Sequence, residues 1–184
     1  MRITHQVCMT TNSVTVDGRK LATKSQGVDL LSEVYRSHVG DYPKFFKMDL
    51  LCKLGFVASE LLLQAEGDRH TGCDDRAVVL FNRSASLNDD VRYQETINDE
   101  NDFYPSPAVF VYTLPNIVTG EIAIRNKYYG ETSFFVLDEH DEVLMQQLLQ
   151  SVFDDGYAKS AITGWVECDD SDFFEAYLTI VYND

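Results

Sequence analysis

The feature that most constrains the fold is a run of five apolar residues, 77–81, bounded by Arg76 and Asn82. An uninterrupted apolar run of this length is typical of a strand buried on both faces of a parallel sheet. Before it, residues 47–64 carry apolar side chains at helical spacing, and Gly67 is placed to end that helix. Strand-like and helix-like segments alternate along the chain, so the sequence predicts a layered α/β domain.

The remaining strands are predicted from the alternation of apolar and polar residues and from their content of β-branched residues. Residues 1–9, 132–137, 160–167 and 173–182 are expected to be strands, and residues 10–26 a hairpin or surface excursion. Residues 82–107 are polar and are expected to form a surface excursion with one helix. The last strand is expected to have one apolar face, formed by Phe174, Ala176, Leu178, Ile180 and Tyr182.

Two further helices are predicted from their end signals. Pro115 suits the first turn of a helix that runs to about Tyr129 and is closed by Gly130. Asp138 is expected to cap a helix that ends at Phe153. Gly120 falls inside the first of these helices, so we expect close packing to require it there.

Length and charge narrow the class of protein. The 184 residues suit one domain, 1–184, and the net charge is −15. Residues 1–92 hold 12 acids and 12 bases, whereas residues 93–184 hold 18 acids and three bases. Such a surface would repel phosphate, so no nucleic-acid partner is expected. No apolar run is long enough for a membrane span and no leader-like segment is visible, which favours a cytoplasmic protein without a membrane partner.

The cysteines and histidines are scattered. Cys8, Cys52, Cys73 and Cys168 form no CxxC pair, which favours buried thiols over disulfides or a zinc site. The segment from Asp68 to Asp75 gathers His70, Cys73 and several carboxylates, but its spacing fits no metal site, so we expect a solvated loop. Neither a metal nor a cofactor is expected.

The stretch from residue 104 to residue 124 resembles the β-ketoacyl-(acyl-carrier-protein) synthases. That family has a Ser-Pro before a strand and a Pro-Asn that opens a helix containing Gly and Ile-Ala. The matching residues here are Ser106, Pro107, Pro115, Asn116, Gly120, Ile122 and Ala123. Further on, Gly130 and the segment Ala161-Ile162-Thr163-Gly164 stand where the family has a strand-opening glycine and an Ala-Ile-x-Gly motif. The match covers most of the chain and is dense from about residue 106 to 164.

The resemblance implies a thiolase-like fold, and this chain corresponds to its N-terminal half. Each half has a five-stranded mixed sheet in the order 3-2-1-4-5, with the last strand antiparallel and helices on its faces. The family keeps its two catalytic histidines in the other half. The chain is therefore identified as similar to one half of a synthase.

The resemblance also locates the family's nucleophilic cysteine. Counting from Gly130 reaches Glu139, between Asp138 and His140, and no cysteine lies nearby. A carboxylate there could at most assist decarboxylation. The alternative is purely structural, because acidic residues in a first turn cap backbone N–H groups and oppose the helix dipole. We favour the structural reading and expect no catalytic residue.

These implications lead to a hypothesis of function. We expect a non-catalytic partner subunit in fatty acid or polyketide-type synthesis that dimerises with itself or with a full-length ketosynthase and contacts acyl carrier protein. One alternative is a synthase subunit that becomes active when a second chain supplies the missing half. Another is a scaffold that binds an acyl chain or carrier protein without a role in synthesis. The edge strand at Thr132, Phe134 and Phe135 is the expected interface, flanked by Ile117 and Ile124. An uncovered helix face is also expected, at Val143, Leu144, Leu148 and Val152.

Overall fold

The computed structural model describes residues 1–67, 69–98, 104–169 and 173–183. Its strands are β1 (Arg2–Thr10), β2 (Ser13–Val16), β3 (Arg19–Lys20), β4 (Arg76–Asn82), β5 (Thr132–Val136), β6 (Ser160–Cys168) and β7 (Phe174–Tyr182). Its helices are α1 (Val28–Val34), α2 (Leu50–Glu66), α3 (Leu87–Glu95), α4 (Pro107–Tyr112), α5 (Ile117–Asn126) and α6 (Glu142–Asp154). A π-helical turn (Tyr35–Val39) and a 3-10 turn (Pro43–Lys47) join α1 to α2.

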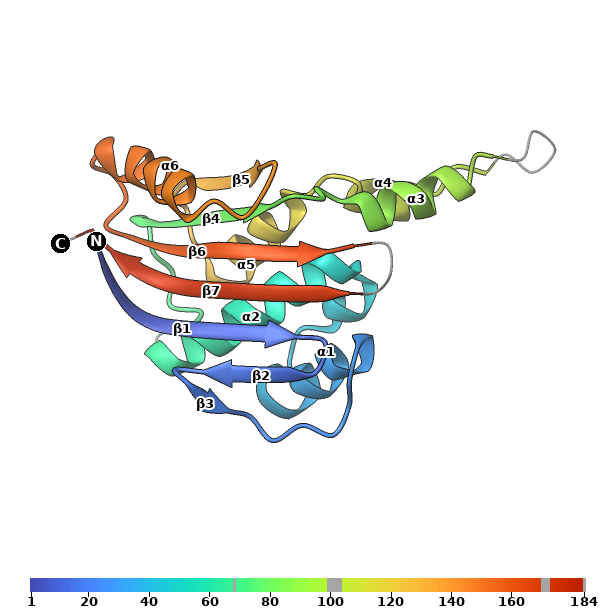
Figure 1. Cartoon of the computed structure of the whole chain (residues 1–184), viewed down its shortest axis with the longest axis horizontal. Coiled ribbons are helices and arrows are strands. Elements are labelled where there is room, and N and C mark those ends of the chain that lie inside the picture. The colour runs from blue at the N-terminus through green and yellow to red at the C-terminus, as the bar shows by residue number, and fades with distance from the viewer. Residues whose placement is uncertain (68, 99–103, 170–172, 184) are drawn as a thin grey trace.

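The strands form one mixed sheet in the order β3-β2-β1-β7-β6-β4-β5. Helices α1, α2 and α5 cover one face, and α6 covers the β4–β5 end of the other (Figure 1). Helices α3 and α4 pack on each other and extend beyond one end of the sheet as an arm. The α/β class and the flanking helices are therefore as predicted. No helix of the described residues is long and apolar enough to span a membrane.

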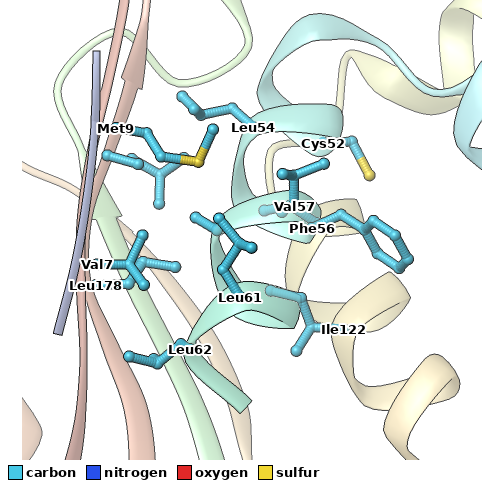
Figure 2. Close-up of a cluster of buried hydrophobic side chains, with 14 of the residues drawn as sticks. Val7, Met9, Cys52, Leu54, Phe56, Val57, Leu61, Leu62, Ile122 and Leu178 are labelled. Carbon is cyan, nitrogen blue, oxygen red and sulfur yellow. The ribbon is translucent and has the colours of Figure 1, made fainter. Parts of the chain in front are cut away.

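Helix α2 is the centre of the larger core. Asp49 caps its first turn by accepting hydrogen bonds from the backbone N–H groups of Leu51 and Cys52, and Gly67 ends it in the left-handed conformation. Leu54 points toward the sheet at Met9 and Leu62 toward the sheet near Val7, while Phe56 points to the other side, toward α5 (Figure 2). Since both sides of α2 are buried, this helix fixes the distance between the sheet and the outer helix α5.

The strand order corrects the prediction in two respects. The sheet has seven strands rather than five, because the hairpin β2–β3 extends it beyond β1. The five predicted strands also lie in the order third-second-fourth-fifth-first, since β6 pairs directly with β4 and β1 lies outside β7. The predicted antiparallel last strand is confirmed.

Burial explains this order. Every residue of β4 and β6 is buried, as expected for the central strands of a sheet that is covered on both faces. In β1 only Val7 and Met9 are buried and the other residues are at least partly exposed. A strand with one wet face is stable away from the centre, so β1 occupies an outer position.

Helix α6 buries more of its apolar face than expected. Leu149, Val152 and Phe153 pack in a second core with Phe81 and Trp165, and Leu148 packs against it. Only Val143 and Leu144 of the predicted uncovered face are exposed. The prediction was wrong for Val152 because that side chain faces its own sheet.

Three element boundaries also differ from the predictions. Helix α6 begins at Glu142, and its cap is Asp141 rather than Asp138. Helix α5 begins two residues after Pro115, with Asn116 as its cap residue, and ends at Asn126, with Lys127 rather than Gly130 as the left-handed residue that closes it. The segment after Ser106 is helix α4 rather than a strand, since Ser106 accepts the Val109 N–H and Pro107 opens the first turn.

The glycines of the family motifs differ in their surroundings. A Cβ at Gly164 would lie 1.9 Å from the Tyr177 carbonyl oxygen, and one at Gly130 would lie 2.4 Å from the Arg76 carbonyl oxygen. Both positions therefore allow two backbones to approach closely. A Cβ at Gly120 would meet nothing within 4 Å. The expectation that packing requires Gly120 was wrong, because its side of α5 faces open space.

Candidate functional site

The position predicted for a nucleophile lies in the loop between β5 and α6. Asp138, Glu139 and His140 are all exposed in this loop. Asp141 accepts hydrogen bonds from the N–H groups of Val143 and Leu144, at 2.9 and 3.0 Å. One acidic residue of the cluster thus has a clear structural role as a cap, whereas Glu139 is exposed and has no hydrogen bond or ion pair among the described residues.

The loop lies at the carboxyl edge of the parallel strands, where α/β proteins commonly place their ligand sites. The ring of His140 packs on Trp165 with 4.8 Å between centroids. Glu167, near the end of β6, is buried and accepts the Arg83 backbone N–H through Oε2. Its Oε1 has no hydrogen-bond partner among the described residues. The edge therefore holds an imidazole and a carboxylate, and the thiol of Cys168 at the end of β6 is buried beneath it.

The thiols are unsuited to nucleophilic catalysis. Burial raises the pKa of Cys168 and of Cys52 far above the ordinary value, and both side chains are almost fully buried. Burial also raises the pKa of Cys8 and of Cys73. A catalytic cysteine needs a lowered pKa and access to substrate. All four cysteines are free; Cys52 and Cys168 are buried as predicted, whereas Cys8 and Cys73 are partly exposed.

Strand β5 is at the edge of the sheet, as predicted, and pairs with β4 alone. Glu131 accepts the Val78 N–H, and the Leu137 N–H donates to Asn82, both at 2.8 Å. Odd-numbered residues therefore direct their backbone groups to β4, and the even-numbered Thr132, Phe134 and Val136 direct theirs outward.

The two phenylalanines of this strand are both half-buried. Phe134 packs against the core around α2, and Phe135 stacks on Phe81 with 5.4 Å between ring centroids. Each ring therefore packs mainly within its own chain. The exposed apolar side chains at this edge are Val136 and Ile124, at 51% and 66% exposure.

The loop around His70 forms an ion-pair network. His70 and Arg69 approach the fully buried Glu60 of α2, at 3.2 and 3.3 Å, and Arg125 lies 3.7 Å from the same oxygen. Cys73 instead donates to Asp75 at 2.8 Å. Asp68 lies outside the described residues. Among the described residues no group of three or more His, Cys, Asp or Glu side chains is placed to hold a metal ion.

Sequence reasoning missed a pair of buried carboxyl groups, Asp49 on α2 and Asp89 on α3, which are 6% and 2% exposed. Burial and the neighbouring Asp89 raise the pKa of Asp49 to about 8. Asp89 lies in the acidic segment 87–90, so nothing in the sequence distinguishes it from a solvated side chain. The only available signal was Asp49 as a cap before an apolar helix.

No protein-family model and no curated protein matches the chain. Among solved structures, the ishigamide ketosynthase/chain length factor aligns over 98% of this chain and 61% of its own, with a TM-score of 0.75 and 18% identity. The chain has the ketosynthase fold. A ketosynthase in complex with its chain length factor from Xenorhabdus doucetiae aligns over 100% of this chain and 79% of its own, with a TM-score of 0.64 and 11% identity.

A third ketosynthase structure agrees. The structure of a type II polyketide synthase acyl-carrier protein in complex with its ketosynthase contains a chain that aligns over 98% of this chain and 62% of its own length. The TM-score is 0.59 and the identity 13%. The chain thus spans about three fifths of the first and third of these ketosynthase-fold chains. At these identities the likeness establishes the ketosynthase fold.

Proposed function

We propose that the protein is a non-catalytic partner of a ketosynthase, comparable to a chain length factor, in acyl-carrier-protein-dependent fatty acid or polyketide synthesis. The observation that carries this proposal is the loop after β5. It stands where the resemblance places the nucleophile, yet it holds an exposed Glu139 and no thiol. A chain that keeps the ketosynthase fold without this residue can still contribute surface to a partner.

The fold neighbours support a paired arrangement. One of them is a ketosynthase in complex with its chain length factor, and another is a ketosynthase in complex with an acyl-carrier protein. Here the open edge of β5 and the exposed Val136 and Ile124 offer a place for a second chain. No lysine or proline blunts this edge. We propose that β5 pairs with a second copy or with a ketosynthase.

A proline at position 136 tests this interface. The Val136 N–H faces away from β4, so Val136→Pro removes an outward donor and leaves the β4–β5 hydrogen bonds intact. We expect the variant to fold with an unchanged denaturation midpoint and to associate at least about tenfold more weakly, as loss of edge pairing implies. Sedimentation velocity of the chain alone, and mixed with a full-length ketosynthase of the same organism, measures the association.

Val136→Thr is the matched control, because it keeps the backbone N–H and a β-branched side chain. It should associate like the wild type. A wild type that stays monomeric at micromolar concentration, both alone and with the ketosynthase, would contradict the proposed interface.

A further inference from the structure

One surface of this acidic protein is basic. Lys47, Lys53 and Arg92 line an open groove of about 410 Å³ between the start of α2 and the arm formed by α3 and α4. Phe46 also lines this basic groove, and the Arg36 guanidinium lies 5.7 Å from the centre of its ring. Within the described residues, Arg36, Lys47 and Lys53 have no ion-pair partner. In a protein with a net charge of −15, this cluster of cations is available to an acidic group from outside the chain.

The acidic residues of the basic groove do not neutralise its cations. Asp49 and Asp89 line it as well, but they share a hydrogen bond, and burial raises the pKa of both carboxyl groups. Because the pKa of Asp49 is about 8, the two carboxyl groups together hold about one negative charge at neutral pH. Both are buried, whereas Lys47 and Arg92 are exposed. A partner therefore meets a positive surface.

The apolar wall of the basic groove belongs to α4. Every residue of this helix is apolar or aromatic, yet none of them is buried. Ala108 and Val109 line the groove, and Phe46, which is 53% exposed, adds an aromatic ring to the lining. Clustered apolar side chains that stay exposed mark interaction surfaces. A helix of this composition that its own chain leaves uncovered is suited to contact with a partner.

The form of the basic groove indicates which kind of partner it fits. It is open, and charged side chains lie beside the apolar wall, whereas sites for small molecules are enclosed and mostly apolar. An amphipathic helix that lies in a groove presents apolar and polar faces side by side. Nucleic acid would satisfy the cations with its phosphates, but its backbone has no apolar stripe to cover α4.

We propose that the basic groove docks an acidic amphipathic helix of a partner protein. The apolar stripe of that helix lies against Val109 and Phe46, and its carboxylates pair with Lys47 and Arg92. This inference goes beyond the proposed function, since no residue of β5 lines the groove and either surface can bind without the other.

Three labelled helical peptides of about 16 residues test the chemistry by fluorescence anisotropy on the whole chain. The first has leucines on one face and glutamates on the other; lysines replace the glutamates in the second, and serines replace the leucines in the third. We expect the first to bind with a Kd of about 10–100 μM, at least about tenfold more tightly than the other two, and to weaken as salt is added. Equal or tighter binding of the lysine peptide, the serine peptide or a DNA duplex, or no saturable binding of the first, would overturn the proposal.

Matched pairs of variants locate the binding. Lys47→Glu reverses an exposed charge in the groove and should weaken binding of the acidic peptide about tenfold. Lys159→Glu makes the same change at the start of β6, the end remote from the arm, and should have no effect. Ala108→Glu, inside the groove, should weaken binding in the same way, while Val111→Glu, on the same helix but outside it, should not. Equal losses within either pair would show unspecific charge attraction and contradict the proposal.

Discussion

Gly164→Ala should destabilise the fold by on the order of 3–5 kcal/mol, a large part of the stability of an ordinary domain. The added methyl group would lie 1.9 Å from the Tyr177 carbonyl oxygen and 3.0 Å from the Leu178 Cα, and both atoms belong to the backbone of the neighbouring strand β7. Position 164 also has a φ of +144°, a conformation that alanine adopts at a further cost. Urea denaturation followed by circular dichroism measures the loss.

Gly120→Ala is the control for this substitution. It adds the same methyl group in the middle of α5, where a Cβ would meet nothing within 4 Å. Because alanine favours helix, we expect a gain of about 0.5–1 kcal/mol. A loss at both positions, or no loss at Gly164, would contradict the packing described for β6 and β7.

Asp49→Asn should flatten the dependence of stability on pH. In the folded chain, burial and the nearby Asp89 raise the pKa of Asp49 from 3.8 to about 8, so the folded state keeps a proton that the unfolded state releases. The stability that this proton contributes is fully present below pH 4 and is lost as the pH rises to about 8. The slope for one such group is at most about 1.4 kcal/mol per pH unit.

Other titratable groups lie near Asp49 as well. Asp89 and Arg92 of α3, Lys53 and Cys52 of α2, and Cys168 of β6 remain in both proteins. The variant removes only the titrating carboxyl and keeps an oxygen that can cap α2. We therefore expect similar midpoints at pH 4 and, from pH 5 to pH 8, a progressively higher midpoint for Asp49→Asn than for the wild type, measured by urea denaturation in steps of one pH unit.

Asp141→Asn provides the matched control, since Asp141 caps α6 in the same way but is exposed. Its pH profile should run parallel to that of the wild type. Parallel profiles for Asp49→Asn and the wild type would show that the buried pair does not hold the additional proton.

Elements with a strong local signal were predictable from sequence. The alternation in β7, the continuous apolar run of β4 and the spacing of α2 each specify one element and the face that it buries. Strand order could not be obtained in the same way, because it depends on which distant strands pair. The alternation of polar and apolar residues in β1 did indicate its place in the sheet, since a strand with one solvent-exposed face suits an outer position.

The candidate site was predictable only in part. The position of Glu139 in the loop after β5 could be predicted, because it depends only on the number of residues between Gly130 and Glu139. Asp49 and Asp89 are brought together by the packing of the arm on α2, and neither residue carries a local mark of that contact. Similarly, the family resemblance implied a strand after Ser106 and Pro107, although these two residues carry the cap and first-turn signals with which α4 begins.

The most direct measurement of the central claim is acyl labelling of a mixture of the wild-type chain and a full-length ketosynthase with radiolabelled acyl-carrier protein. Gel separation of the chains after the reaction shows which of them holds the acyl group. We predict label on the ketosynthase alone, while sedimentation shows the two chains in one complex. Stoichiometric labelling of this chain that thiol reagents release, or activity that requires its Glu139, would contradict a non-catalytic role.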